Sequence, residues 1–409
     1  MTTPGFSKLR PTPFAVQIFF ITFAGQTETV TTTTQMEKSK DCERIAFLDW
    51  IRVVACFMVM LVHAGENFYG ADPSGLAGNM SMLANEQNRF FVALYNGTIG
   101  RISVPLFMAV SAYLLVPVRS GLGMRGFYKK RFLRILPPFI LFSLLYCVLP
   151  LAWHGMSAEQ SMTDLKNLLF NFPSLAGHLW FMYPLISLYL IIPVVSPWLE
   201  KASAKDERTF LYIFAFSTLM PWLHKFVTPE LWGECFWNEF HALWYCSGFL
   251  GYVVLAHYIR FHITWDDSKR RTVGALCLVA GAIFTGWSFW WKGVPGVMIV
   301  TPILEWSWEF CTPNVALSTF GAFLLFSTIK SKAPAIVTEI SKLSFGMYLM
   351  HMFFLSPIAT FIIVDGDRAN PMIPVWLAIP CIAAATYICC AVTTKILSML
   401  PLSKYTVGA

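Results

Sequence analysis

The segment IAFLDWIRVVACFMVMLVHA, residues Ile45 to Ala64, decides the fold of this chain. It is apolar over enough residues for one α-helix to cross about 30 Å of hydrocarbon. Arg52 and His63 interrupt it, and because a helix turns about 100° per residue, their spacing returns both side chains to one face, about 16 Å apart. An ionisable side chain near the centre of a bilayer costs on the order of 2.5 to 3.5 kcal/mol, so this polar face predicts an interior lined by protein or water.

The composition of the chain indicates a membrane protein. Of 409 residues, 56% are hydrophobic and 13% are charged, which is too few charged side chains to cover a soluble globule of this size. The net charge of +7 does not indicate nucleic-acid binding, because the basic residues lie in short clusters between apolar runs, where the positive-inside rule explains them. The ten cysteines form neither CxxC pairs nor a His/Cys cluster of zinc type, so no metal site is predicted.

The apolar runs predict an all-α fold, a polytopic helical bundle in the membrane. Basic residues gather in alternate loops, above all before and within the segment Lys129 to Arg134, which predicts that both termini are cytoplasmic. About ten runs are long enough to cross the bilayer. They are residues 45–65, 98–117, 134–153, 180–198, 208–224, 241–259, 272–291, 311–329, 342–363 and 373–397.

Three regions follow from this pattern. Residues 1–43 are an extension with one short apolar stretch, expected to be disordered or interfacial. Residues 44–400 form the transmembrane domain, and 401–409 a short cytoplasmic tail. The longest external segment is predicted from Asn67 to Gly97, and no further soluble domain is visible. The chemistry is therefore expected inside the bundle or at its two mouths.

The polar face of the first span has two local pairs. A neutral imidazole near the outer membrane face can act as a general base, and His63 has Glu66 one turn further on to orient its ring. An interhelical hydrogen bond by His63 is the alternative, with about equal weight. Arg52 lies one turn from Asp49, and a snorkelling Asp49–Arg52 pair would satisfy it without any ligand.

The basic segment before the third span places Arg131 and Arg134 one helical turn apart. Two guanidinium groups at this spacing can hold a phosphate group bidentately. Topology or contact with anionic lipids is the simpler explanation of an isolated basic loop. The combination of a phosphate-type site inside with a candidate base outside favours a phosphorylated donor that binds inside and reaches along the bundle.

Further polar residues inside the later spans are weaker candidates. His351 shares a helix face with Tyr348, and His178 precedes Trp180 where the fourth span begins. Each alone is more often a structural hydrogen-bonding residue than a catalyst.

Together these positions resemble the membrane-bound acyltransferase 3 family, most of all its branch of surface-polysaccharide and enterobacterial-common-antigen O-acetyltransferases. The resemblance extends from residue 44 to about 397. The matching stretches are Leu48-Asp49-Trp50-Ile51-Arg52 with His63, Val104-Pro105-Leu106-Phe107-Met108 through Ser111-Ala112-Tyr113, Arg131-Phe132-Leu133-Arg134, His178-Leu179-Trp180-Phe181, and Ser344-Phe345-Gly346-Met347-Tyr348-Leu349 with His351.

This resemblance implies a multi-pass enzyme of the bacterial inner (plasma) membrane. Acyl-CoA, usually acetyl-CoA, would dock from the cytoplasm as a co-substrate, with no permanently bound cofactor, and its acyl group would pass to a hydroxyl of a glycan or lipid-linked sugar. His63 would be the catalytic base or acyl relay, and Arg52, Arg131 and Arg134 would bind the acyl donor. Supporting or acceptor-site roles would fall to Asp49, Glu66, Ser111, Tyr113, His178, Trp180, Tyr348 and His351.

Two departures from the family pattern concern the cavity and the acceptor. Ser111-Ala112-Tyr113 stands where the family more usually has a small residue, glycine and an aromatic residue, and no fused esterase-like domain is present to receive the acyl group. Transfer would then go directly to the acceptor. Whether an acyl-histidine forms on the way stays open, because both routes need the same residues. Membrane lipids are expected partners, and a homo-oligomer stays open.

Two other classes of function compete with acyl transfer. One is a polytopic transporter or a flippase of lipid-linked sugars, but ten spans do not divide into two matched six-span halves, and the polar residues do not follow a repeat interface. The other is a receptor or scaffold without chemistry, which would leave the placement of His63, Arg131 and Arg134 as a coincidence. The sequence therefore favours a membrane acyltransferase.

Overall fold

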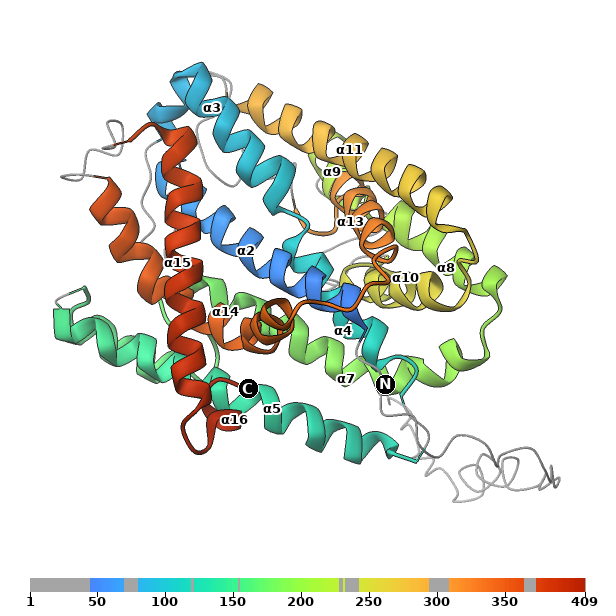
Figure 1. The fold of residues 1–409 in the computed structure, drawn as a ribbon, viewed down its shortest axis with the longest axis horizontal. Coiled ribbons are helices and arrows are strands. Elements are labelled where there is room, and N and C mark those ends of the chain that lie inside the picture. The colour runs from blue at the N-terminus through green and yellow to red at the C-terminus, as the bar shows by residue number, and fades with distance from the viewer. Residues whose placement is uncertain are drawn as a thin grey trace, which may run out of the picture. The chain divides into compact units, whose positions relative to one another are not determined.

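The computed structural model describes residues 45–69, 80–118, 121–153, 155–227, 231, 243–293, 309–363 and 373–408. The chain divides into two units, Met1–Arg44 and Ile45–Ala409, of which only the second has described residues. Every regular element in the described residues is helical, which confirms the all-α prediction (Figure 1). The predicted N-terminal extension, residues 1–43, lies outside the described residues.

The helices follow one another along the second unit, with those labelled η being short 3-10 or π-helical segments. In chain order they are α2 (Ala46–Tyr69), η1 (Met80–Ala84), α3 (Glu86–Val92), η2 (Ala93–Gly100), α4 (Ser103–Leu115), α5 (Gly123–Val148), η3 (Leu149–Trp153), α6 (Ala158–Asn167), η4 (Gly177–Phe181), α7 (Met182–Lys201), α8 (Ala204–Ser217), α9 (Met220–Phe226), η5 (Trp244–Cys246), α10 (Phe249–Phe261), α11 (Asp267–Lys292), α13 (Pro313–Phe326), α14 (Ala335–Ile362), α15 (Val375–Ser398) and α16 (Ser403–Thr406).

Seven helical segments within the described residues are long and apolar enough to cross a membrane. They are Ala46–Tyr69, Glu86–Leu115, Gly123–Trp153, Gly177–Lys201, Asp267–Lys292, Ala335–Ile362 and Val375–Ser398. These confirm seven of the predicted runs. The other three coincide with α8, α10 and α13, which have 14, 13 and 14 residues and are too short to cross about 30 Å alone. The count of ten spans and the cytoplasmic placement of the termini stay predictions.

The predicted external loop from Asn67 to Gly97 is wrong in part. Helix α2 continues to Tyr69, and helical structure resumes at Met80 and leads into α4. The Asn85 side chain accepts a hydrogen bond from the Asn88 backbone and caps α3, which the apolar count alone does not reveal. The helix then brings Asn96 against α2, where its side chain donates to the Val62 carbonyl at 2.9 Å.

Helix α5 also begins earlier than the run 134–153 predicts. It starts at Gly123 and includes the basic segment, because Lys and Arg are good helix formers. It continues through Pro137 and Pro138, which lack the backbone N–H that would bond the preceding turn. The carbonyl of Arg134, left without the Pro138 donor, faces the C-terminal residues: a Cβ at Gly408 would lie 3.6 Å from its oxygen.

Residues near the C-terminus pack onto the bundle. Helix α16 contacts α5, and Val407 directly after it is fully buried. Gly346 of α14 allows this approach, because a Cβ there would lie 3.0 Å from the Val407 backbone carbonyl. The end of the chain therefore contacts both the basic helix α5 and α14.

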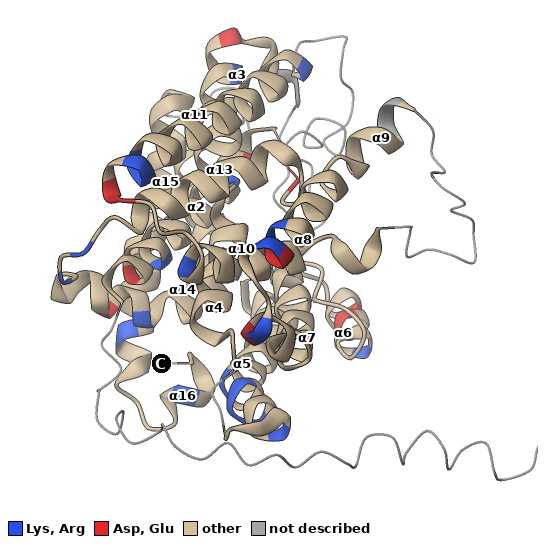
Figure 2. Cartoon of the chain, turned by 90° about the vertical axis from the view of Figure 1, so that its right-hand side faces the viewer, with Lys and Arg blue, Asp and Glu red and all other residues tan. Residues whose placement is uncertain are grey.

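Helix α2 is the centre of the second unit. It contacts α14, α15, α4 and η2, and Figure 1 shows it with α11 and α13 above it and α5 below. Ile51, Ala55, Met60 and Ala64 are completely buried along its length. Most of the helical ribbon in Figure 2 is neither acidic nor basic, and Lys and Arg stand out on α5. The face of α2 that carries these buried residues is enclosed by protein.

Helices α11 and α13 pack closely against each other, and glycines let the two backbones approach. A Cβ at Gly321 would lie 2.4 Å from the Leu278 backbone nitrogen and 2.5 Å from the Gly274 carbonyl oxygen. Backbone atoms cannot move aside as a flexible side chain does. In a membrane the hydrophobic effect does not drive helices together, so helix pairs depend on van der Waals packing. Small residues allow the close approach that this packing needs.

We expect Gly321→Ala to lower the free energy of unfolding by about 1 to 3 kcal/mol, because the added methyl group overpacks this interface. Gly126→Ala is the matched control: it is also a helical glycine, but its Cβ would approach only the Leu122 side chain, at 3.3 Å. Thermal melts of the purified protein in detergent measure both variants. A Gly321→Ala melting temperature equal to that of the control would contradict the close packing.

Candidate active site

The polar face of α2 begins with a charged pair in its first two turns. Asp49 Oδ1 accepts a hydrogen bond from the Ser341 hydroxyl at 2.7 Å and lies 3.5 Å from Arg52 Nη1. The predicted Asp49–Arg52 pair is therefore present, and it also ties α2 to α14. Only 2% of the Asp49 side chain is exposed, against 27% for Arg52. The arginine keeps part of its surface open to a ligand while its charge is balanced.

His63 lies in the last two turns of α2 beside an acidic partner. Its Nδ1 is 2.7 Å from Glu66 Oε2, and Glu66 Oε1 is 3.5 Å from Arg101 Nη2. Because a carboxylate only accepts hydrogen bonds, Nδ1 of the neutral ring donates its proton, and Nε2 is then the proton-accepting nitrogen. The Glu66 contact holds the ring in the tautomer that a general base needs, and Arg101 in turn holds Glu66.

Two histidines from distant parts of the chain join His63. The His351 ring of α14 stacks on the His63 ring, with centroids 5.2 Å apart and planes 26° apart. The His178 ring of η4 meets His351 edge-on at 4.6 Å. We call His63, His178 and His351 the histidine cluster. The sequence identifies its members separately, and the structure brings them together.

Hydrogen bonds to backbone carbonyls orient His351 and His178 of the histidine cluster. His351 Nδ1 donates to the Tyr348 carbonyl at 2.6 Å, and His178 Nε2 donates to the Leu349 carbonyl at 3.3 Å. The Tyr348 hydroxyl donates to the His178 carbonyl at 2.5 Å, so the predicted candidate Tyr348 supports the same segment.

The remaining nitrogens of these two rings have no hydrogen-bond partner within the described part of the chain. They are His351 Nε2 and His178 Nδ1, and both residues are almost fully buried. A buried polar atom without a partner costs about 1 to 3 kcal/mol. Both atoms are acceptors in the tautomers given above, so they suit the hydroxyl groups of a bound molecule.

The predicted donor-binding arginines share one neighbour in the electrostatics of the bundle, Tyr189 of α7. The charges of Arg131, Arg134 and Arg52 all act on its hydroxyl, which is also hydrogen-bonded to the side chain of Ser111. The arginines come from two helices, α5 and α2, that are far apart in sequence. We call Arg52, Arg131 and Arg134 the arginine site. Its positive charge suits a phosphate group.

An open groove of about 720 Å³ lies along α5, the helix that carries two of these arginines. Arg125 and Lys129 give it positive charge, and the rest of its lining is largely apolar: Met124, Tyr128, Phe132, Leu133, Leu136 and Pro137. This combination suits an amphipathic anion such as an acidic lipid. Four of the five basic residues of α5 therefore fall into two groups, Arg125 and Lys129 in this groove and Arg131 and Arg134 at the arginine site.

Two further candidates pack around the site. Trp180 stacks on Phe310 at 5.3 Å, and the Arg101 guanidinium lies over the same ring at 5.9 Å, so Trp180 borders the residues that hold Glu66. Tyr113 lies elsewhere: its carbonyl accepts a hydrogen bond from Arg260, which joins α4 to α10. Its contacts are part of the helix packing.

Three residues of this arrangement were missed by the sequence analysis: Arg101, Tyr189 and Ser341. Arg101 stands near the start of the apolar run 98–117, where a basic residue is also a common topology signal. Its contact with Glu66 depends on how the segment after η2 packs on α2, which no local pattern shows. Tyr189 and Ser341 are uncharged and lie in helices, so nothing in their surroundings distinguishes them from packing residues.

The described arrangement supports two chemical operations. A histidine with a carboxylate behind it can take a proton from a hydroxyl group, as the histidine cluster allows. The arginine site can bind phosphate. Arg52 and His63 connect the two along one helix, about 16 Å apart by the rise of the α-helix. A long donor with a phosphate end and a reactive end fits this separation.

Comparison with known proteins is consistent with this chemistry. A family model described as Acyltransferase domain matches residues 45–395, which is most of the chain. No curated protein and no solved structure matched. The family match and the apolar helices together make this a membrane acyltransferase, and a transporter is not favoured. The chain belongs to the acyltransferase 3 family.

Proposed function

We propose that this protein is an O-acyltransferase that moves an acetyl or other short acyl group from cytoplasmic acyl-CoA to a hydroxyl of a cell-surface polysaccharide or its lipid-linked precursor. In this proposal it is a multi-pass protein of the bacterial inner membrane. The contact between His63 Nδ1 and Glu66 Oε2, 2.7 Å long and backed by Arg101, is the observation that supports it most. It is the arrangement that activates a hydroxyl nucleophile in acyl transfer.

The transfer step uses the proton-accepting nitrogen of His63. Nε2 takes the proton of the acceptor hydroxyl as its oxygen forms a bond to the acyl carbon. Glu66 stabilises the imidazolium that results. The bond between the acyl carbon and the CoA sulfur then breaks, and the imidazolium returns its proton to the leaving thiolate. An acyl-histidine route would place the acyl group on the same nitrogen first, and a trapped acyl group on His63 would distinguish the two.

The donor would bind at the arginine site with its phosphate groups. Arg131 and Arg134 lie one turn apart on α5, and Arg52 approaches from α2. Guanidinium groups hold phosphate oxygens through paired hydrogen bonds. The thioester end of acyl-CoA would then extend along the polar face of α2 toward His63.

The acceptor would bind at the histidine cluster. His351 Nε2 and His178 Nδ1 offer two buried acceptors to sugar hydroxyl groups. The Trp180 and Phe310 rings, stacked beside Arg101, add an apolar surface of the kind on which a sugar ring packs. These residues support a glycan acceptor, and they give the supporting roles of the site a physical basis.

We expect His63→Ala to abolish acyl transfer while acyl-CoA binding is retained, because the variant lacks the base but keeps the arginine site. His224→Ala is the matched control, since His224 binds the Met220 carbonyl of its own helix at 2.8 Å and lies in α9. Mass spectrometry of surface glycans from cells that express each variant in place of the intact gene measures acetylation. Wild-type acetylation by His63→Ala would remove His63 from the mechanism.

We expect Glu66→Gln to lower kcat at least tenfold, about 1.4 kcal/mol in the barrier, without changing the KM for acyl-CoA. The amide keeps the shape of the side chain but cannot stabilise the imidazolium. Glu66→Asp should restore part of the rate, because it restores the negative charge. Release of free CoA from the purified enzyme measures these rates. If Glu66→Gln and Glu66→Asp lost activity equally, the role of the charge would be refuted.

We expect replacement of both Arg131 and Arg134 by Ala to weaken acyl-CoA binding at least tenfold, about 1.4 kcal/mol. The control removes the same charge from the same helix: Arg125 and Lys129, in the groove, are both replaced by Ala. Calorimetry with a non-hydrolysable acyl-CoA analogue compares the two double variants. Equal affinity in both would assign Arg131 and Arg134 to topology or lipid contact.

A further inference from the structure

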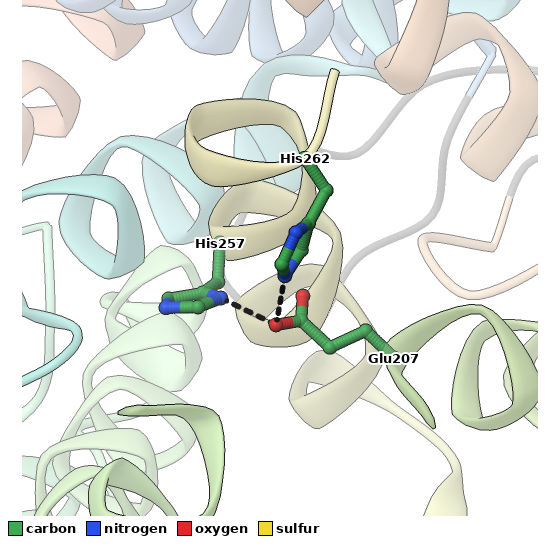
Figure 3. Close-up of side chains that lie close together, drawn as sticks. All are labelled: Glu207, His257 and His262. Atoms are coloured by element: carbon green, nitrogen blue, oxygen red, sulfur yellow. Dashed lines mark hydrogen bonds and ion pairs between the residues drawn. The ribbon is translucent and has the colours of Figure 1, made fainter. Parts of the chain in front are cut away.

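A second polar centre lies outside the candidate active site, between α8 and α10. Glu207 of α8 and two histidines of α10 and its C-terminal end converge there, as Figure 3 shows. His257 Nδ1 is 2.8 Å from Glu207 Oε1, and His262 Nε2 is 2.9 Å from the same oxygen. We call Glu207, His257 and His262 the Glu–His–His centre. None of the three was singled out by the sequence, which predicts no metal site.

Because this centre is buried, a charged Glu207 carboxylate is energetically unfavourable there unless it is paired. Glu207 is 0% exposed and His257 is 4% exposed, while 20% of the His262 side chain is accessible. Both histidines approach Oε1, and Glu207 Oε2 is buried without a hydrogen-bond partner in the described residues. An isolated buried carboxylate is costly unless it is paired or coordinates a metal. Oε1 of Glu207 thus accepts two hydrogen bonds, whereas Oε2 accepts none from the described residues.

Two arginines close in sequence to His257 and His262 donate to backbone carbonyls rather than to Glu207. Arg260 Nη1 donates to the Tyr113 carbonyl, and Arg270 Nη2 donates to the Ile263 carbonyl at 2.7 Å. The ring of Phe261 packs on His257 with centroids 4.5 Å apart, which adds apolar surface to the centre. The charge of Glu207 is therefore met chiefly by the two imidazole rings.

We propose that the Glu–His–His centre binds a divalent transition-metal ion of zinc type. Two imidazole nitrogens and a carboxylate are ligands that zinc accepts, and all ligand atoms lie within 4.8 Å of one another. Zinc bonds of about 2.0 to 2.1 Å in a tetrahedron place ligand atoms about 3.3 Å apart. The two observed nitrogen–oxygen contacts, 2.8 and 2.9 Å, widen by about half an ångström to meet this spacing, and the two imidazole nitrogens lie within 4.8 Å of each other. The orphaned Oε2 is placed to join as a second oxygen or to bind a metal-bound water.

Metal binding here requires a simple change of proton position. In the metal-free centre His257 Nδ1 and His262 Nε2 donate protons to the carboxylate. With the ion bound, each ring presents that nitrogen's lone pair and carries its proton on the other nitrogen, so both imidazoles stay neutral. The ion replaces two hydrogen bonds by three coordination bonds.

The position of the centre indicates a structural role. It joins α8 to the C-terminal end of α10, and α10 packs on α4. The N-terminus of α8 is separately held by a capping box, in which hydrogen bonds from Ser203 hold the pKa of the Asp206 carboxyl below its usual value. Helices α8 and α10 have 14 and 13 residues, so each has less surface to pack against the bundle than a full-length span. A metal ion would lock them together.

The test is metal binding by the full-length protein, purified in detergent without chelators and without a polyhistidine tag. We expect about one zinc ion per chain by elemental mass spectrometry, and a tetrahedral visible spectrum on titration with Co²⁺. Zn²⁺ should also raise the Tm of protein stripped by a chelator. Less than about 0.1 metal ion per chain together with no Co²⁺ spectrum would overturn the proposal.

Variants locate the ion. Glu207→Gln and His257→Gln should each weaken Zn²⁺ binding more than about tenfold, because each removes a ligand. His224→Gln, a histidine of α9 outside the centre, should bind Zn²⁺ as the parent does. Size-exclusion chromatography shows whether a variant that has lost Zn²⁺ binding is still folded. If a variant does not fold, metal binding by the wild-type protein still tests the proposal. A Tm that responds to pH but not to Zn²⁺ would show a proton-linked ion pair instead and overturn the metal site.

Discussion

Charged and polar groups inside an apolar bundle must find partners within the protein, and the rest of this structure depends on how α2 meets that requirement. Asp49 is bonded to Ser341 of α14, and Glu66 is placed between His63 and Arg101. The contacts with Ser341 and Arg101 join α2 to other segments, so groups beside the candidate chemistry also hold the bundle together. Breaking one partner of such a buried pair costs several kcal/mol, which makes these positions poorly tolerant of change.

The two sites of the proposed reaction are separated along α2. The arginine site and the histidine cluster lie at different levels of α2, one near its first turns and the other near its last. In the proposed function, a donor with a phosphorylated end would be held at the first, and a hydroxyl acceptor would meet its base at the second. The Glu–His–His centre is separate from both, and its proposed ion would act on the scaffold rather than on the reacting groups.

Local features of this protein could be predicted from sequence, and long-range ones could not. Contacts three residues apart on one helix, such as His63 with Glu66, follow from helical geometry alone. The stacking of His351 on His63 depends on which helices become neighbours. Hydropathy overestimated the lengths of α8, α10 and α13, because apolar residues continue beyond the ends of these helices. It underestimated α5, where basic residues and two prolines remain helical.

The sidedness of the reaction is the most direct test of transfer along α2. Sealed membrane vesicles of both orientations, prepared from cells that express the protein, are supplied with radiolabelled acetyl-CoA on the outside only. Label should enter the glycan acceptor in inverted vesicles, in which the cytoplasmic face predicted for Arg131 and Arg134 is turned outward. Right-side-out vesicles should incorporate none. Equal incorporation in both orientations would contradict a donor site on one face and a base toward the other.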